Sequence, residues 1–121
     1  MIKAIFLAFL LTFGGDVRKK DNIKVIALGD SITKCFSREC WVKILGQQTE
    51  FKTTNKGIGG ETLEQMNRRI DRDVIKNKPD VCIILGGTND VFYKNYDPAK
   101  SMAQIHSMVK KLKESKIHAV I

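Results

Sequence analysis

The chain has 121 residues, of which 43% are hydrophobic and 28% are charged, and its formal net charge is +8 at pH 7. This length predicts one domain, and the composition is that of an ordinary globular protein with a core. A positive net charge would suit an anionic partner. The basic residues are scattered, however, and no aromatic residues are interleaved with them for base stacking. The composition therefore argues against a nucleic-acid-binding protein.

The first 15 residues differ from the rest of the chain. Lys3 precedes an apolar run from Ala4 to Phe13, which two glycines follow. This is the outline of a secretory signal peptide, and it is too short for a transmembrane helix of about 20 apolar residues. We expect a signal peptide at 1–15, a linker at 16–22 and an exported protein with no stable membrane span. The alternative is an N-terminal element packed on the domain of a cytoplasmic protein.

The next part of the chain predicts a buried strand, a short helix, a weaker strand and a long amphipathic helix, at residues 23–28, 40–45, 49–55 and 62–76. Gly29 is expected to end the first strand, and Gly46 to close the short helix. Thr62 and Gln65 have the spacing of a capping box at the start of the long helix.

The last part predicts a strand, a helix and a further strand. Val81 to Leu85 is a continuous apolar run, typical of a strand covered on both faces. Asp97 and Pro98 open the helix as N-cap and first helical residue. Its expected buried stripe is Met102, Ile105, Val109 and Leu112. A final strand is expected from His118 to Ile121. Strands that alternate with helices predict a parallel sheet with right-handed crossovers.

The three cysteines leave some questions open. Cys35 and Cys40 flank a short polar stretch and could pair if the protein is exported. Cys82 lies inside an apolar strand and is interpreted as a buried core thiol. No Cys-x-x-Cys or histidine-rich spacing indicates a metal site, so we expect no metal and no cofactor.

Three short motifs carry the functional signal. They are Gly29-Asp30-Ser31-Ile32, Gly57 to Thr62, and Gly86 to Asp90, and each follows a predicted strand. Loops that follow the carboxyl ends of parallel strands meet at one edge of the sheet, where ligands bind. A serine, a glycine-rich turn and an asparagine at that edge indicate a nucleophile with an oxyanion hole.

These motifs resemble, in order, the first three sequence blocks of the GDSL, or SGNH, hydrolases, and the resemblance covers residues 23–121. It implies a flavodoxin-like three-layer α/β/α fold. The implied activity is hydrolysis of an ester or thioester through an acyl-serine intermediate, with a lipid or an acetylated carbohydrate as the small acyl-ester substrate. The family's fourth block, Asp-x-x-His, is absent. We therefore expect the chain to be the N-terminal portion of a C-terminally incomplete domain, with the catalytic His and Asp beyond Ile121.

The resemblance also implies roles for individual residues. Ser31 would be the nucleophile and donate its backbone N–H to the oxyanion, Gly60 would donate a second backbone N–H, and Asn89 would donate its side-chain amide. Asp30 is expected to shape the turn, and Asp90 to brace a loop. The structural alternatives are an N-cap serine, a glycine in a tight turn and an Asx-turn asparagine.

The three motifs do not supply a general base for Ser31. His106 is predicted to lie mid-helix, and His118 at the start of the last strand, so neither is expected to serve Ser31. Without a base a serine is a weak nucleophile, and residues 1–121 alone are expected to be nearly inactive and poorly stable. One alternative is a catalytically inactive SGNH-like binding module for acylated glycans or lipids. A phosphate or nucleotide binder is disfavoured because the lysine of a phosphate loop is absent.

Overall fold

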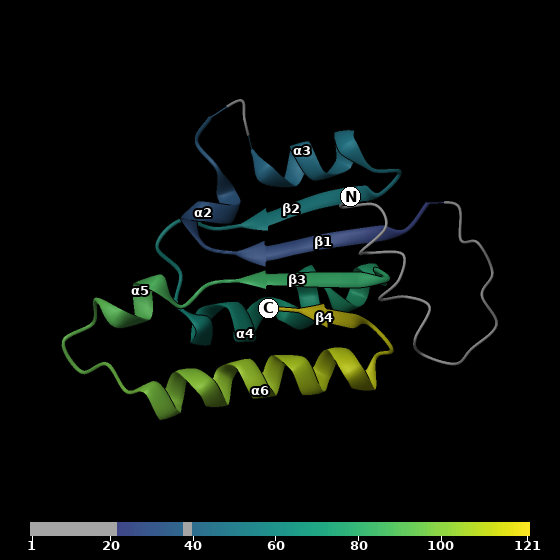
Figure 1. Ribbon diagram of the computed structural model, residues 1–121. Coiled ribbons are helices and arrows are strands. Elements are labelled where there is room, and N and C mark those ends of the chain that lie inside the picture. The colour runs from purple at the N-terminus through teal and green to yellow at the C-terminus, as the bar shows by residue number, and fades with distance from the viewer. Residues whose placement is uncertain (1–21, 38–39) are drawn as a thin grey trace.

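The computed structural model describes residues 22–37 and 40–121, so the predicted signal peptide and residues 16–21 of the predicted linker lie outside the described residues. Figure 1 shows a β-sheet flanked by helices. In chain order the elements are β1 (Lys24–Gly29), α2 (Ser31–Lys34), α3 (Trp41–Gln48), β2 (Lys52–Gly57), α4 (Leu63–Asp73), the 3₁₀ turn η1 (Ile75–Asn77), β3 (Val81–Leu85), α5 (Thr88–Val91), α6 (Pro98–Glu114) and β4 (His118–Val120).

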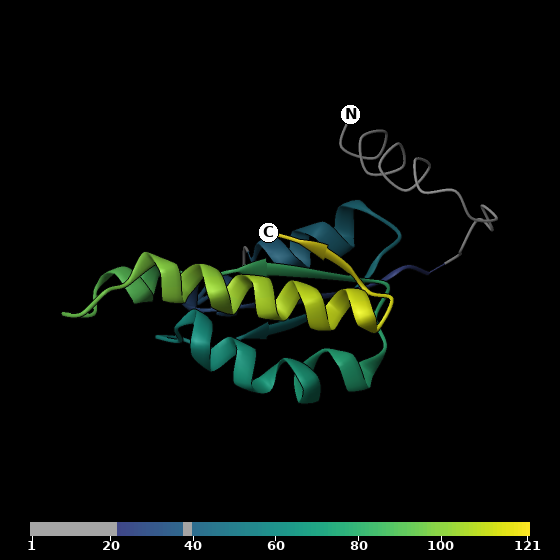
Figure 2. The ribbon, with the colours of Figure 1, turned by 90° about the horizontal axis from the view of Figure 1, so that it is seen from below.

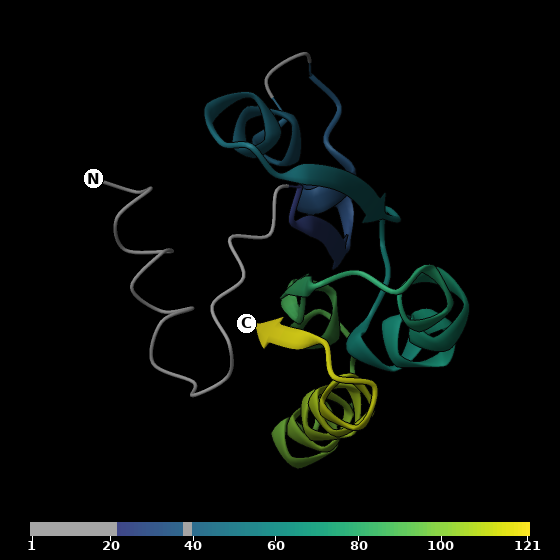
Figure 3. The ribbon, with the colours of Figure 1, turned by 90° about the vertical axis from the view of Figure 1, so that its right-hand side faces the viewer.

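The strands of the described residues form one parallel sheet in the order β2-β1-β3-β4. Helix α3 covers one face, and helices α4 and α6 cover the other (Figures 2 and 3). This strand order in three layers is that of flavodoxin-like folds, so the predicted fold class is confirmed. Gly29 at the end of β1 pairs with Gly57 on one side and Leu85 on the other. The chain therefore leaves these three strands at the same level of the sheet.

The larger core lies between the sheet and helices α4 and α6. Alternate residues of β1 and β3 point toward these helices because side chains on a strand alternate between its two faces. The buried cluster comprises Ile26, Leu28, Leu63, Met66, Ile70, Val74, Cys82, Ile84, Met108, Leu112 and Ile117. Burial raises the pKa of the free Cys82 thiol to about 12. Cys82 is thus a buried core thiol, as the sequence predicts.

Helix α3 continues through Gly46, so the prediction that Gly46 closes this helix is wrong. The glycine serves packing instead. A methyl group at position 46 would lie 2.6 Å from Thr53 Oγ1 on β2. The missing side chain therefore allows α3 to lie close against the strand, and the helix ends only at Gln48.

Helix α6 begins as predicted, because the Asp97 carboxylate accepts a hydrogen bond from the Ala99 N–H at 2.9 Å. Its buried stripe differs from the prediction. Met102 is 49% exposed, whereas Met108 is fully buried. The helix starts beyond the carboxyl ends of the strands (Figure 1), so its first turns have no sheet to cover. Among the described residues, no helix combines the length and apolar character needed to cross a membrane.

Candidate active site

Ser31 is the first residue of α2, directly after β1, and is half-buried. Asp30 caps this helix, since its Oδ1 accepts a hydrogen bond from the Ile32 N–H at 2.9 Å. Asp30 is only 1% exposed and shapes the turn as predicted. The alternative that Ser31 is itself the N-cap is therefore wrong, and the serine lies one residue inside the helix at the carboxyl edge of the sheet.

The loop of residues 57–62 lies next to Ser31. The Ile58 N–H donates to the Gly29 carbonyl at 2.9 Å, and a methyl group at Gly59 would lie 3.9 Å from Ser31 Cβ. Gly60 has a φ of +79°, in the left-handed region that favours glycine. A methyl group at Gly60 would meet no atom within 4 Å. The space around Gly60 is therefore open, and its neighbour Gly59 is the residue of this loop that lies beside the serine.

Asn89 lies in α5, just after the end of β3. Its side-chain Nδ2 donates to the Glu61 carbonyl at 2.8 Å, across 28 positions of sequence. This contact links the third motif to the second and is unlike the local bond of an Asx turn. An amide nitrogen carries two N–H donors, so this bond occupies one of the two.

Asp90 has a bracing role as predicted, but it joins two helices and not a loop. Its Oδ2 accepts a hydrogen bond from the Leu63 N–H at 3.0 Å, and its Oδ1 accepts one from the Ser101 hydroxyl at 3.2 Å. Asp90 therefore holds the start of α4 and the start of α6 against α5.

The two histidines lie away from Ser31. His118 pairs with Val81 at the start of β3, whereas the candidate site lies beyond the other end of this strand, at Leu85. His106 is an exposed residue of α6. His118 therefore lies at the opposite end of the sheet from the serine, and His106 is exposed to solvent in the middle of α6.

Arg69 is a residue that the sequence reasoning missed. Its side chain is 6% exposed, and it binds Glu61, Asp73 and two backbone carbonyls. The available signal was local: position 69 adjoins the apolar stripe of α4, and Asp73 follows four residues later, a spacing that favours an ion pair on a helix.

Arg72 donates two hydrogen bonds to Asp73, and together with Arg69 it lowers the pKa of the Asp73 carboxyl to about 2, against the opposing effect of burial. This carboxylate contributes stability that is fully present above its unfolded pKa of about 3.9 and is lost as pH falls through about 2. We expect Asp73→Asn to be destabilising at pH 5, with a deficit that shrinks as pH falls to 2. Urea unfolding at pH 5, 3 and 2 measures this change.

Arg72→Met provides the matched comparison, because it removes the largest cause of the lowered pKa of Asp73. In that background, Asp73→Asn should show a weaker pH dependence. A deficit that stays constant between pH 5 and 2 in the otherwise unchanged protein would contradict the assignment.

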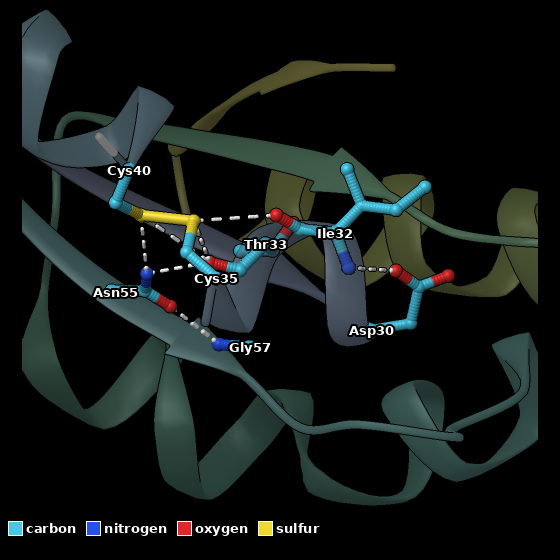
Figure 4. The surroundings of a disulfide bond; sticks show 7 residues. All are labelled: Asp30, Ile32, Thr33, Cys35, Cys40, Asn55 and Gly57. Atoms are coloured by element: carbon cyan, nitrogen blue, oxygen red, sulfur yellow. Dashed lines mark hydrogen bonds between the residues drawn. A yellow bond between two sulfur atoms is a disulfide. The ribbon is translucent and has the colours of Figure 1, made fainter. Parts of the chain in front are cut away.

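A disulfide joins Cys35 to Cys40 beside the end of α2 (Figure 4). Asn55 reinforces this link: its Nδ2 donates to the Thr33 carbonyl at 2.5 Å, and its Oδ1 accepts from the Gly57 N–H at 2.8 Å. The pairing that the sequence left open is therefore present. The chain that leaves the serine-bearing helix is tied to the start of α3 and to β2.

A pocket of about 540 Å³ opens between the start of α4, α5 and the start of α6. Thr62, Asp90, Tyr93 and Tyr96 are among its lining residues, whereas Ser31, Gly60 and Asn89 are not. The pocket therefore adjoins the candidate site without containing it.

This chain is similar in sequence and in fold to several known proteins. The chain is 33% identical to an uncharacterised lipoprotein, YqeF, of Bacillus subtilis in an alignment of 96 residues that covers 71% of this chain and 39% of that protein. It is 44% identical to an acetylxylan esterase of Geobacillus stearothermophilus over 46 residues, 38% of this chain and 20% of that enzyme. It also resembles the structure of a protein from Desulfitobacterium hafniense, described as lipolytic and of the G-D-S-L family. That similarity has a TM-score of 0.75 and 32% identity, covering 81% of this chain and 57% of the other.

The chain therefore spans 57% of the length of the Desulfitobacterium protein and less than half of the length of the other two relatives. The family profile of the GDSL-like lipases and acylhydrolases matches residues 27–121, which include all three motifs. This chain belongs to the GDSL-like lipase/acylhydrolase family.

Proposed function

We propose that this chain carries the nucleophile and the oxyanion donors of a carboxylic-ester hydrolase that acts through an acyl-serine intermediate. The observation that carries the proposal is the contact chain from Ser31 to the loop of residues 57–62, and from Glu61 of that loop to Asn89. This arrangement supports the proposal, because the serine, the glycine-rich loop and the asparagine all follow strand ends at the edge where a parallel sheet binds ligands.

In the proposed reaction, Ser31 Oγ bonds to the carbonyl carbon of the ester while its proton passes to a general base. The carbonyl oxygen becomes an oxyanion, to which the N–H groups of Ser31 and Gly60 and the second amide N–H of Asn89 would donate. Collapse of this intermediate expels the alcohol, which takes the proton, and leaves an acyl-serine. Water then hydrolyses the acyl-serine and restores the hydroxyl.

We infer that the base comes from another part of the full-length protein, because His118 lies at the opposite end of the sheet and His106 is exposed on α6. We assign it to a histidine oriented by an aspartate, as in other serine hydrolases. A protein without such a base would be an inactive module that binds acylated glycans or lipids.

An acetylated carbohydrate is the substrate class that we favour. The support is the similarity to the acetylxylan esterase of Geobacillus stearothermophilus over 46 residues.

We also propose that the protein is exported. The Cys35–Cys40 disulfide is typical of an oxidising compartment, and the Bacillus subtilis relative is a lipoprotein. The predicted signal peptide at 1–15 points the same way.

A fluorophosphonate probe tests the proposal. The full-length protein should be labelled at Ser31, with mass spectrometry of the peptide locating the adduct, and Ser31→Ala should abolish the labelling. Ser37→Ala, which changes a nearby exposed serine, should be labelled as the unchanged protein is. Labelling that survives Ser31→Ala would refute the assignment of the nucleophile. A protein that takes no label but binds acetylated xylan would favour the binding module.

A further inference from the structure

Arg69 of α4 extends under the candidate site from the helix layer. Its guanidinium is almost completely buried, with 6% of the residue exposed. Nε donates to Glu61 Oε2 at 2.7 Å and Nη1 donates to Asp73 Oδ2 at 2.9 Å. Nη2 donates to two backbone carbonyls, that of Gly29 at 3.1 Å and that of Lys56 at 2.9 Å. One side chain thus binds the ends of two strands and the loop between β2 and α4.

The positions of these partners relative to the candidate donors are specific. Gly29 precedes Ser31 by two residues, and Lys56 is the penultimate residue of β2, just before the loop that carries Gly60. Glu61 directly follows Gly60, and its own carbonyl accepts the Asn89 amide. Arg69 therefore contacts the main chain near Ser31, contacts residues on both sides of Gly60, and reaches Asn89 through Glu61.

A buried network of charged side chains, such as that of Arg69, is not the most stabilising arrangement for a protein interior. Well-packed hydrophobic residues often replace buried ion pairs without loss of stability, because desolvation of the charges is costly. An arginine does something that an apolar residue cannot: its planar guanidinium holds several acceptors in a fixed relative geometry, and a lysine offers only a compact point charge. The four contacts of Arg69 are of this kind.

We propose that Arg69 is a positioning residue that, together with Glu61, fixes the three oxyanion donors relative to one another. The inference rests on the proposed acyl-serine function. Arg69 itself touches neither the substrate nor the reacting atoms. It acts through the backbone of β1 and β2 and through Glu61, so its loss would shift the donors and lower kcat while leaving substrate binding nearly unchanged.

Steady-state hydrolysis of p-nitrophenyl acetate by the full-length protein tests the proposal. Rates are expressed per Ser31 site titrated with the fluorophosphonate probe, so that a lower folded fraction does not lower kcat. We expect Arg69→Met to lower kcat about tenfold, since small misplacements of catalytic groups can be this costly. KM should stay within about twofold, and Arg69→Lys should fail to restore kcat.

The same helix supplies matched controls. Arg68 and Glu64 form an exposed ion pair with the same residue types as the buried pair of Arg69 and Glu61. Arg68→Met and Glu64→Ala should change kcat by less than about twofold, as expected for an exposed pair. Glu61→Ala cuts only one contact of Arg69 and is expected to lower kcat about threefold to fivefold, with unchanged KM. If Arg69→Met does not fold, the positioning role is tested by comparing the kcat of Glu61→Ala with that of Glu64→Ala.

The possible failures are distinguishable. If Ser31→Ala retains the activity, the proposed function is wrong. If Ser31→Ala abolishes the activity while the Arg69 and Glu61 variants keep kcat within about twofold of the unchanged protein, the positioning role alone is refuted. A rise in KM at constant kcat would likewise overturn it, because that pattern belongs to a residue that binds the ground state.

Discussion

Asn89→Ala in the full-length protein is expected to lower kcat by ~10²–10³-fold, which is the usual cost of one lost oxyanion donor. The reason is that negative charge develops on the carbonyl oxygen only in the transition state, so a donor aimed at this oxygen contributes little to substrate binding. KM should accordingly change little. The position of Asn89 supports this expectation, since its amide is held by the Glu61 carbonyl at 2.8 Å and needs no reorientation.

Steady-state kinetics with p-nitrophenyl acetate measures this effect, and thermal unfolding separates it from instability. Loss of the bond to Glu61 should cost about 1 kcal/mol of stability, which leaves the protein folded at room temperature. Asn95→Ala, an exposed asparagine that follows α5, serves as the control and should keep its turnover. A loss of kcat below roughly threefold, near 0.65 kcal/mol, would leave Asn89 with only its bond between the two loops as a role.

Gly57→Ala should be the most destabilising single methyl addition in the candidate site. The added carbon would overlap the backbone of Thr33 and Lys34 in α2. Backbone atoms cannot rotate away as a side chain can, so β2 and α2 must separate. We expect a loss of about 3 kcal/mol in the free energy of unfolding, at the upper end of the usual cost of overpacking. The same separation would move Ser31 away from the loop of residues 57–62.

Gly59→Ala is the matched control for stability. Its methyl group would lie 3.9 Å from the nearest atoms, an ordinary contact distance. Urea unfolding of the two variants should show a much lower midpoint for Gly57→Ala and a nearly unchanged one for Gly59→Ala. Equal midpoints would mean that the approach of β2 to α2 is not as tight as the structure has it.

The sequence predicted best those elements whose signals are local. Val81 to Leu85 forms β3 with the predicted bounds, because a continuous apolar run is typical of a strand that is covered on both faces of a parallel sheet. Thr62 and Asp97 cap their helices as predicted. Strand β2 was placed too early, at residues 49–55 instead of Lys52–Gly57, because its polar side chains carry no apolar pattern. Pairing with β1 decides where this strand lies.

In the candidate site, too, the features with local sequence signals were the predictable ones. The three motifs reach one edge of the sheet as predicted, because their positions follow from the alternation of strands and helices. Arg69 could not be predicted in the same way. Two of its four acceptors are backbone carbonyls, which leave no mark in a sequence, and Glu61 and Gly29 are joined to it only by the fold.

The position of β2 has a consequence for how the proposed activity would be lost. This strand is at the edge of the sheet in the described part of the chain, and none of its residues is fully buried. Segments with few buried apolar contacts open at a lower free energy than the whole domain, whereas β1 and β3 are held in the core. An excursion of β2 would carry Gly60 and Glu61 away from Ser31 with the core intact. We therefore expect the proposed activity to be lost on heating at a temperature below that at which the domain melts.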